Sequence, residues 1–164
     1  MGKSEIGMGL KQLKIDYLAL HKKYGLPGFK EMNEDFSIEK IAENETDILI
    51  REVRRMVGDR LTNYMRFIEN LLNPVNAPMF VFTIIKLIGP EEKDKLSDIY
   101  KKLIQNEIKF VERDLEFDEA QEARFIKESY KLWQGMKKPL VTIFEKVEKN
   151  WETKKEQNSK DYLG

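Results

Sequence analysis

Apolar residues recur every three or four positions through most of this chain, and this spacing is typical of one face of an α-helix. No segment alternates apolar and polar residues in the way that predicts a β-strand. We therefore expect an all-α fold. The predicted helices cover residues 6–24, 46–72, 91–115, 118–134 and 140–151, with short helical turns within residues 29–44.

One stretch, residues 77–89, differs from the others because it is apolar on every side, interrupted only by Thr83 and Lys86. A helix that is hydrophobic all round is usually enclosed by other elements. A membrane span needs roughly 20 apolar residues, so this stretch is too short to cross a bilayer. Pro78 suits the first turn of a helix, and Gly89 suits its end. We predict a single-domain bundle of six or seven helices around this short, fully apolar central helix.

The end of the chain has a different composition from the rest. From about Thr153 onward the residues are polar, except for Tyr162 and Leu163. We expect residues 1–152 to form the helical bundle domain and residues 153–164 to form a polar, flexible C-terminal tail. An apolar pair after a polar tail can serve as a docking peptide, so Tyr162 and Leu163 form a candidate docking tail. The alternative is that this pair has no role.

The composition narrows the class of protein. Charged residues make up 35% of the chain, which suits amphipathic helices with solvated outer faces. The formal net charge is zero, so no global field attracts nucleic acid or anionic lipid. The absence of cysteine excludes disulfides, thiolate metal sites and cysteine nucleophiles. The first residues lack the apolar core of a signal peptide, so we expect a cytoplasmic protein.

Arginine is concentrated in one predicted helix. Five of the seven arginines lie between residues 51 and 66. At about 100° per residue, four of them fall on one side of this helix, away from its apolar stripe. Arginine is favoured over lysine where a planar donor must grip phosphate or carboxylate. Two interpretations of this side, the arginine face, stay open: an ordinary solvated face, which is usual for charged residues on a helix, and a site for an anionic partner. Its members are Arg51, Arg54, Arg55 and Arg66.

The fifth of these arginines, Arg60, falls inside the apolar stripe of the same helix. A buried guanidinium is costly unless it is paired. Glu107 and Asp114 lie on the apolar face of the helix predicted for residues 91–115, so we predict that Arg60 pairs with one of them. This buried ion pair would fix the register of the two helices. The alternative is a pocket for a ligand or for catalysis, because perturbed ionisable groups also gather at functional sites.

Motifs for metal binding and catalysis do not occur in the sequence. The only histidine is His21, so the Glu-x-x-His pairs of di-metal carboxylate bundles are missing. No serine lies in a Gly-x-Ser-x-Gly turn, and neither a phosphate-binding nor a dinucleotide-binding glycine motif is found. We therefore predict no metal, no cofactor and no catalytic residue.

Three functions follow as hypotheses. The first is a non-enzymatic protein-interaction or adaptor module, based on a helical body, the arginine face and the docking tail. Phe67, Phe110 and Phe125 lie toward the edges of their stripes and would form an interface patch if they were exposed together. The second is a nucleic-acid-binding protein that uses the arginine face, and the third is a small-ligand binder or enzyme with a pocket at Arg60. We expect a protein partner, with nucleic acid or a second copy of the chain as alternatives, and no membrane.

Overall fold

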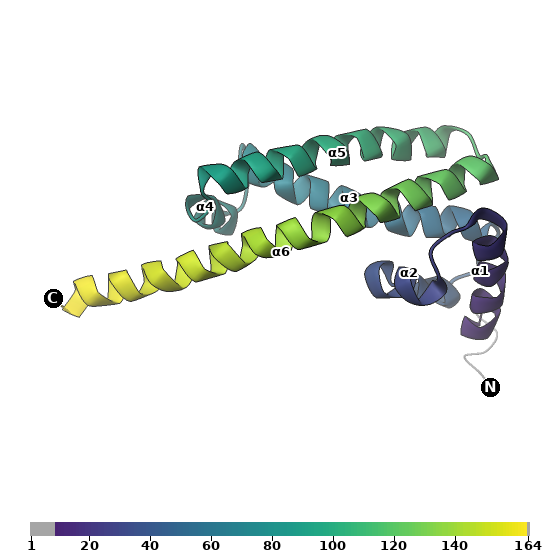
Figure 1. Ribbon diagram of the computed structural model, residues 1–164, viewed down its shortest axis with the longest axis horizontal. Helices are drawn as coiled ribbons and strands as arrows, with labels where there is room; N and C mark the ends of the chain where they lie inside the picture. Colours follow the sequence, from purple (N-terminus) through teal and green to yellow (C-terminus); the bar gives the residue numbers. More distant parts are fainter. Residues whose placement is uncertain (1–8, 164) are drawn as a thin grey trace. The chain divides into compact units, whose positions relative to one another are not determined.

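Seven helices and no strand form the described part of the chain, residues 9–163, in a computed structural model (Figure 1). Side chains are described as far as Asp161. The prediction of an all-α fold with six or seven helices is therefore confirmed. The helices are α1 (Leu10–Tyr24), α2 (Phe29–Phe36), the 3-10 helix η1 (Ile38–Glu43), α3 (Leu49–Leu72), α4 (Met79–Lys86), α5 (Pro90–Leu115) and α6 (Glu119–Leu163).

Local signals in the sequence set the ends of these helices. Gly25 ends α1 in the left-handed conformation, with φ of 67°, and its N–H donates to the His21 carbonyl at 2.9 Å. The His21 ring also contacts the Leu26 carbonyl through Nδ1. At the start of α6, the Asp118 carboxylate accepts a hydrogen bond from the Gln121 N–H at 3.0 Å. The Gly25 N–H bond and the Asp118 carboxylate both satisfy backbone groups that a helix end leaves without partners.

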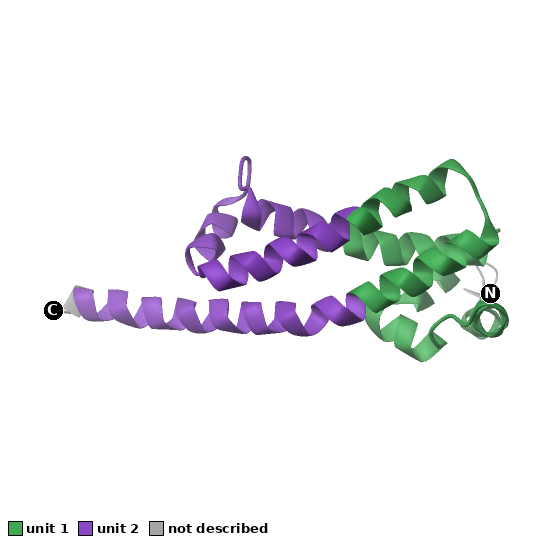
Figure 2. Cartoon of the chain, turned by 45° about the horizontal axis from the view of Figure 1, so that its top comes forward, with its two compact units in different colours: residues 1–62, 105–132 green, residues 63–104, 133–164 purple. Residues whose placement is uncertain are grey.

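The chain forms two compact units, coloured separately in Figure 2. Unit 1 comprises residues 1–62 and 105–132, and unit 2 comprises residues 63–104 and 133–164. The boundaries fall within α3, α5 and α6, so each of these three helices contributes residues to both cores. The assignment of residues 1–152 to one domain stays a prediction.

In unit 1, the helices α1 and α2 lie beside the segments of α3 and α6 that belong to this unit (Figures 1 and 2). The Tyr24 hydroxyl joins α1 to α6 by donating to Glu119 Oε1 at 2.8 Å. Tyr17 is fully buried and donates to the Pro27 carbonyl at 2.5 Å, and burial raises the pKa of its hydroxyl. Other core residues of this unit are Leu13, Met32, Phe36, Ile38, Ile41, Val53, Val57, Ala123 and Ile126.

Unit 2 combines α4 with the remaining segments of α3, α5 and α6. Polar contacts hold the end of α4 and the start of α5 to α6. Asn150 Nδ2 donates to the Leu87 carbonyl at 2.9 Å, and Lys146 Nζ lies 2.8 Å from Glu92 Oε1. The core residues are Ile68, Leu71, Val81, Leu87, Ile88, Leu96, Ile99, Leu103, Trp133, Met136, Leu140 and Ile143.

The predicted central apolar helix is not confirmed, and the prediction that other helices enclose it was wrong. α4 buries Val81, but Phe80 is 59% exposed and Met79 is 84% exposed. The physical reason is that α4 meets the rest of unit 2 on one side only, and a side chain is buried only where another element covers it. The neighbouring helices carry apolar stripes of their own and pack on one another.

The structure also differs from the sequence-based expectation along α6. Separate helices were predicted for residues 118–134 and 140–151, with a break at Gly135, but α6 continues through both Gly135 and Pro139 to Leu163. The reason is that buried side chains on both sides of Gly135, such as Trp133 and Leu140, keep one helical face against the core. Residues 153–163, expected as a flexible tail, are helical as well.

The side chains of Tyr162 and Leu163 lie outside the described part of the structure, so their docking role stays a prediction. Among the described helices, none has the length and apolar character needed to span a membrane.

Candidate functional site

A buried ion pair joins α3 to α6 in unit 1, and its arginine is Arg54. The Arg54 side chain is 1% exposed, and its Nε donates to Glu122 Oε2 at 2.6 Å. Its Nη1 donates to Asp114 Oδ1 at 2.8 Å. Glu122 is 0% exposed, so both members of the pair are removed from water. Such a pair is tolerated because the contacts replace the lost hydration of each charge.

The prediction that Arg60 forms this ion pair was therefore wrong. Arg60 is half-buried and forms no ion pair within residues 9–163. Asp114 pairs with Arg54 instead, and Glu107 accepts a hydrogen bond from the Thr62 hydroxyl. The reason is that Arg54 lies one turn after buried Ile50, at the centre of the face that α3 buries in this unit.

One aromatic ring packs against the Arg54 guanidinium. Its central carbon lies 5.3 Å from the Phe110 ring centroid, and Phe110 stacks on Phe125 at 5.6 Å. Gly58 makes room for this ring, because a Cβ at that position would lie 2.2 Å from Phe110. Phe125 is only 3% exposed, so the exposed patch hypothesised for Phe67, Phe110 and Phe125 is not formed as expected.

The arginine face also differs from the prediction, because Arg54 is buried. Arg51 lies over the Phe117 ring, 4.8 Å from its centroid, and Arg55 Nη1 pairs with Glu52 at 2.9 Å. Arg66 is exposed and belongs to unit 2. A helical wheel drawn for α3 alone cannot show that α6 brings a buried carboxylate to Arg54. Three of the four cations of the arginine face therefore remain outside the core, and the fourth, Arg54, is buried.

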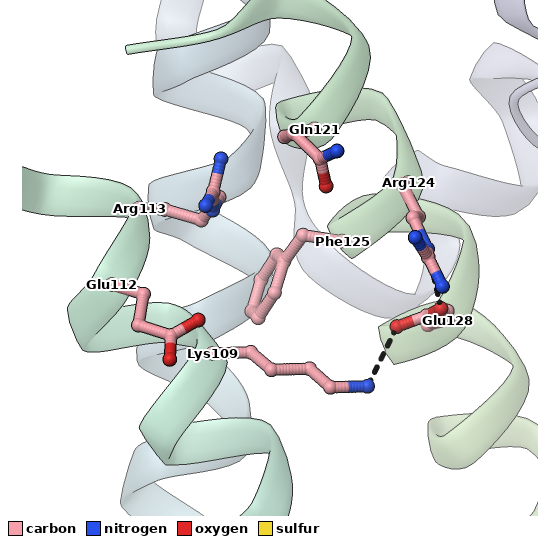
Figure 3. A pocket seen from close by; sticks show the side chains of 7 residues that line it. All are labelled: Lys109, Glu112, Arg113, Gln121, Arg124, Phe125 and Glu128. Carbon is pink, nitrogen blue, oxygen red and sulfur yellow. Dashed lines mark hydrogen bonds and ion pairs between the residues drawn. The ribbon is translucent and has the colours of Figure 1, made fainter. Parts of the chain in front are cut away.

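A pocket of about 210 Å³ lies between α5 and α6 in unit 1 (Figure 3). We call it the basic pocket, because three cations and two carboxylates line it. The cations surround the Phe125 ring in Figure 3, with Arg113 and Arg124 on opposite sides of the ring. Sequence reasoning missed this site, although these are the two arginines that lie outside α3. The lining residues are Lys109, Glu112, Arg113, Gln121, Arg124, Phe125 and Glu128.

One carboxylate of the basic pocket organises two of its cations. Glu128 lies 3.0 Å from Lys109 Nζ and 3.1 Å from Arg124 Nε. The hydrogen bond from Lys109, aided by that from Arg124, lowers the pKa of the Glu128 carboxyl despite its partial desolvation. Arg113 forms no ion pair with any residue that the structure describes. The pocket therefore combines three charges that pair with one another and one guanidinium that is available to a ligand.

A second concave surface lies between α3 and α6 in unit 2. We call it the aromatic groove, and it has a volume of about 430 Å³. The Phe67 and Phe144 rings lie 5.8 Å apart, and Tyr64 packs edge-on against Trp133 at 5.1 Å. The groove is lined by Asn63, Tyr64, Phe67 and Phe144.

Comparisons with known proteins give no indication of the function of this chain. No protein-family model matches the chain, and no match was found among curated proteins or solved structures. Within residues 9–163, no three histidine, aspartate or glutamate side chains are arranged so that they could hold a metal ion.

Proposed function

We propose that this protein is a non-enzymatic protein-interaction module whose docking site is the aromatic groove of unit 2. The observation that carries the proposal is the lining of the groove, in which three aromatic side chains accompany a single polar residue, Asn63. Aromatic anchors in desolvated pockets contribute most of the binding free energy at protein interfaces. Val141, one turn before Phe144 on α6, is 55% exposed and extends the apolar surface.

The arrangement of unit 1 indicates the kind of segment that would bind. There, helices α1 and α2 cover the α3 and α6 segments, and their apolar side chains complete the core. In unit 2 the groove between α3 and α6 is open. Grooves between two helices accept the apolar face of an amphipathic helix. The partner is therefore a protein segment that presents apolar side chains at helical spacing, with the Asn63 amide available to a polar group at its edge.

Photocrosslinking in the native host tests this function. Asn63 is exposed, so p-benzoylphenylalanine at this position would contact a segment bound in the groove. We expect covalent adducts with one or a few proteins, identified by mass spectrometry. The additional substitution Val141→Glu should abolish them, because docking would bury an unpaired carboxylate.

The matched control is Val111→Glu, on α5 in unit 1, where the valine is 53% exposed. It adds the same charge at similar exposure but leaves the groove unchanged, so the adducts should persist. Both variants should keep the circular dichroism spectrum of the parent. Failure to form adducts at position 63, or adducts that survive Val141→Glu, would contradict the proposal. Adducts with a second copy of the chain would identify the partner as the protein itself.

A further inference from the structure

We propose that the basic pocket of unit 1 binds a phosphoryl group, carried by a phosphate monoester or by inorganic phosphate. Lys109, Arg113 and Arg124 place three cations around one concave surface. Two carboxylates, Glu112 and Glu128, leave a net charge of +1 on the pocket lining. The site is separate from the aromatic groove, so this inference does not depend on the proposed function.

The donors available to a ligand are mainly guanidinium groups. Arg113 forms no ion pair within the described residues, so its N–H donors are free of carboxylates. Arg124 uses Nε for Glu128, which leaves its two terminal amino groups. Guanidinium groups bind phosphate oxygens in pairs, which gives both energy and geometric specificity. Gln121 lines the same pocket and lies above the Phe125 ring in Figure 3, where its amide can donate a further hydrogen bond.

The position of the pocket within the fold also favours an anion. Gln121 belongs to the first turn of α6, and the N-terminal end of a helix carries partial positive charge. Contacts of 3.0 and 3.1 Å with Glu128 bring Lys109 of α5 and Arg124 of α6 to the same pocket. The helix end and these cations therefore both favour an anion.

The choice of residue and the volume of the pocket narrow the ligand further. This chain uses 22 lysines and only seven arginines, yet two of the three cations here are arginines. Arginine differs from lysine mainly in its planar, forked geometry, which matches phosphate. A volume of about 210 Å³ has room for a phosphoryl group. A larger ligand would place that group in the pocket and the rest of its atoms outside it.

Titration of the full chain with inorganic phosphate tests the proposal. The titration is monitored by NMR, and chloride keeps the ionic strength constant. We expect saturable shifts of the Arg113, Arg124 and Gln121 side-chain resonances. Arg113→Gln and Arg124→Gln should each weaken binding about tenfold or more, because each removes charged hydrogen bonds. Glu128→Gln should tighten binding several-fold, because it removes a carboxylate that repels the ligand.

Arg55→Gln is the control, because it removes an exposed arginine of the same unit that lies outside the pocket. It should leave the affinity for phosphate unchanged. Peptides with and without one phosphoserine distinguish the two sources of the group. Tighter binding of the phosphopeptide than of inorganic phosphate points to a protein ligand, and equal binding points to a small molecule. Unsaturable shifts, equal losses in Arg55→Gln and Arg113→Gln, or weaker binding in Glu128→Gln would each overturn the proposal.

Discussion

At the scale of single residues, the pair of Arg54 and Glu122 carries the largest electrostatic cost in unit 1. Removing a carboxylate and a guanidinium from water costs several kcal/mol for each ion. Two contacts of Arg54 offset that cost, one of 2.6 Å to Glu122 and one of 2.8 Å to Asp114. The Phe110 ring also covers the guanidinium. Removing either Arg54 or Glu122 would therefore leave the other as a buried charge without this partner.

Removing one member of this pair should lower the free energy of unfolding much more than removing Arg60. We expect Glu122→Gln to lower the free energy of unfolding by about 3–5 kcal/mol, because it leaves the Arg54 charge incompletely paired in the core. Arg60→Gln should change it by less than about 0.5 kcal/mol, as is usual away from such features. Urea denaturation followed by circular dichroism measures both. An equal loss in the two variants would mean that Arg60 also has a buried charge partner.

Gly58 and Gly135 are both helix-interior glycines, but they should respond to alanine with opposite signs. At Gly58 the added methyl would meet the Phe110 ring at 2.2 Å, whereas nothing lies within 4 Å of the corresponding position at Gly135. Overpacking costs about 1–3 kcal/mol, more than the ~1 kcal/mol that alanine gains in a helix. We therefore expect thermal denaturation to show a lower Tm for Gly58→Ala and a higher Tm for Gly135→Ala. A stabilised Gly58→Ala would mean that the ring can move aside at little cost.

At the scale of elements, α4 shows that an apolar sequence is buried only where other elements cover it. Its eight residues form about two turns, and only one side of them meets the rest of unit 2. Val81 lies on that side, while Phe80 and Phe82 are exposed. The longer α3, α5 and α6 bury their stripes against one another, and they provide most of the core that α4 was expected to organise.

Substitutions on the two sides of α4 should therefore differ in cost, although the larger side chain is on the exposed side. Val81→Ala should lower the free energy of unfolding by about 1–3 kcal/mol, because it opens a cavity in the core of unit 2. Phe80→Ser should change it by less than about 0.5 kcal/mol, because the ring is mostly in water. Urea unfolding of both variants tests this difference. A large loss in Phe80→Ser would restore the enclosed central helix of the sequence-based prediction.

At the scale of the whole molecule, 29 basic and 29 acidic side chains balance, and many of them pair across helices or along one helix. Surface pairs are individually weak, because water and salt screen them. Together they still make folding depend on pH. The pKa is lowered for three carboxyl groups, first through a hydrogen bond in each case: Glu92 with Lys146, Glu119 with Tyr24, and Glu128 with Lys109.

We expect the free energy of unfolding to fall as the pH drops below about 4.5. A carboxyl group whose pKa is lower in the folded state binds protons more tightly when unfolded, so its stabilisation is complete above the unfolded pKa and is lost in acid. Urea unfolding at a series of pH values measures the effect, and about 1 M salt should reduce it. Tyr24→Phe should raise the pKa of Glu119 toward its ordinary value in a carboxyl NMR titration. Stability that does not change between pH 5 and 3 would contradict this account.

The sequence by itself determined that the protein is helical and where most of its helices lie. Helical periodicity, the glycine after Tyr24 and the acidic residues before α6 are local features, and a helix forms its hydrogen bonds within one segment. Local patterns therefore predicted the boundaries of α3 and α5 closely. The continuity of α6 through Gly135 was not predicted, because a glycine signals a break unless packing on both sides opposes it.

Only the tertiary structure decided which charged and aromatic side chains meet. Arg54 and Glu122 are 68 positions apart, and the choice between Arg54 and Arg60 depends on which carboxylate α6 brings to α3. The basic pocket and the aromatic groove likewise need two helices each, so neither is visible in the pattern of one. Periodicity identifies the face that a helix buries. It carries no information about the partner of that face, because the partner is fixed by packing between segments that are distant in the chain.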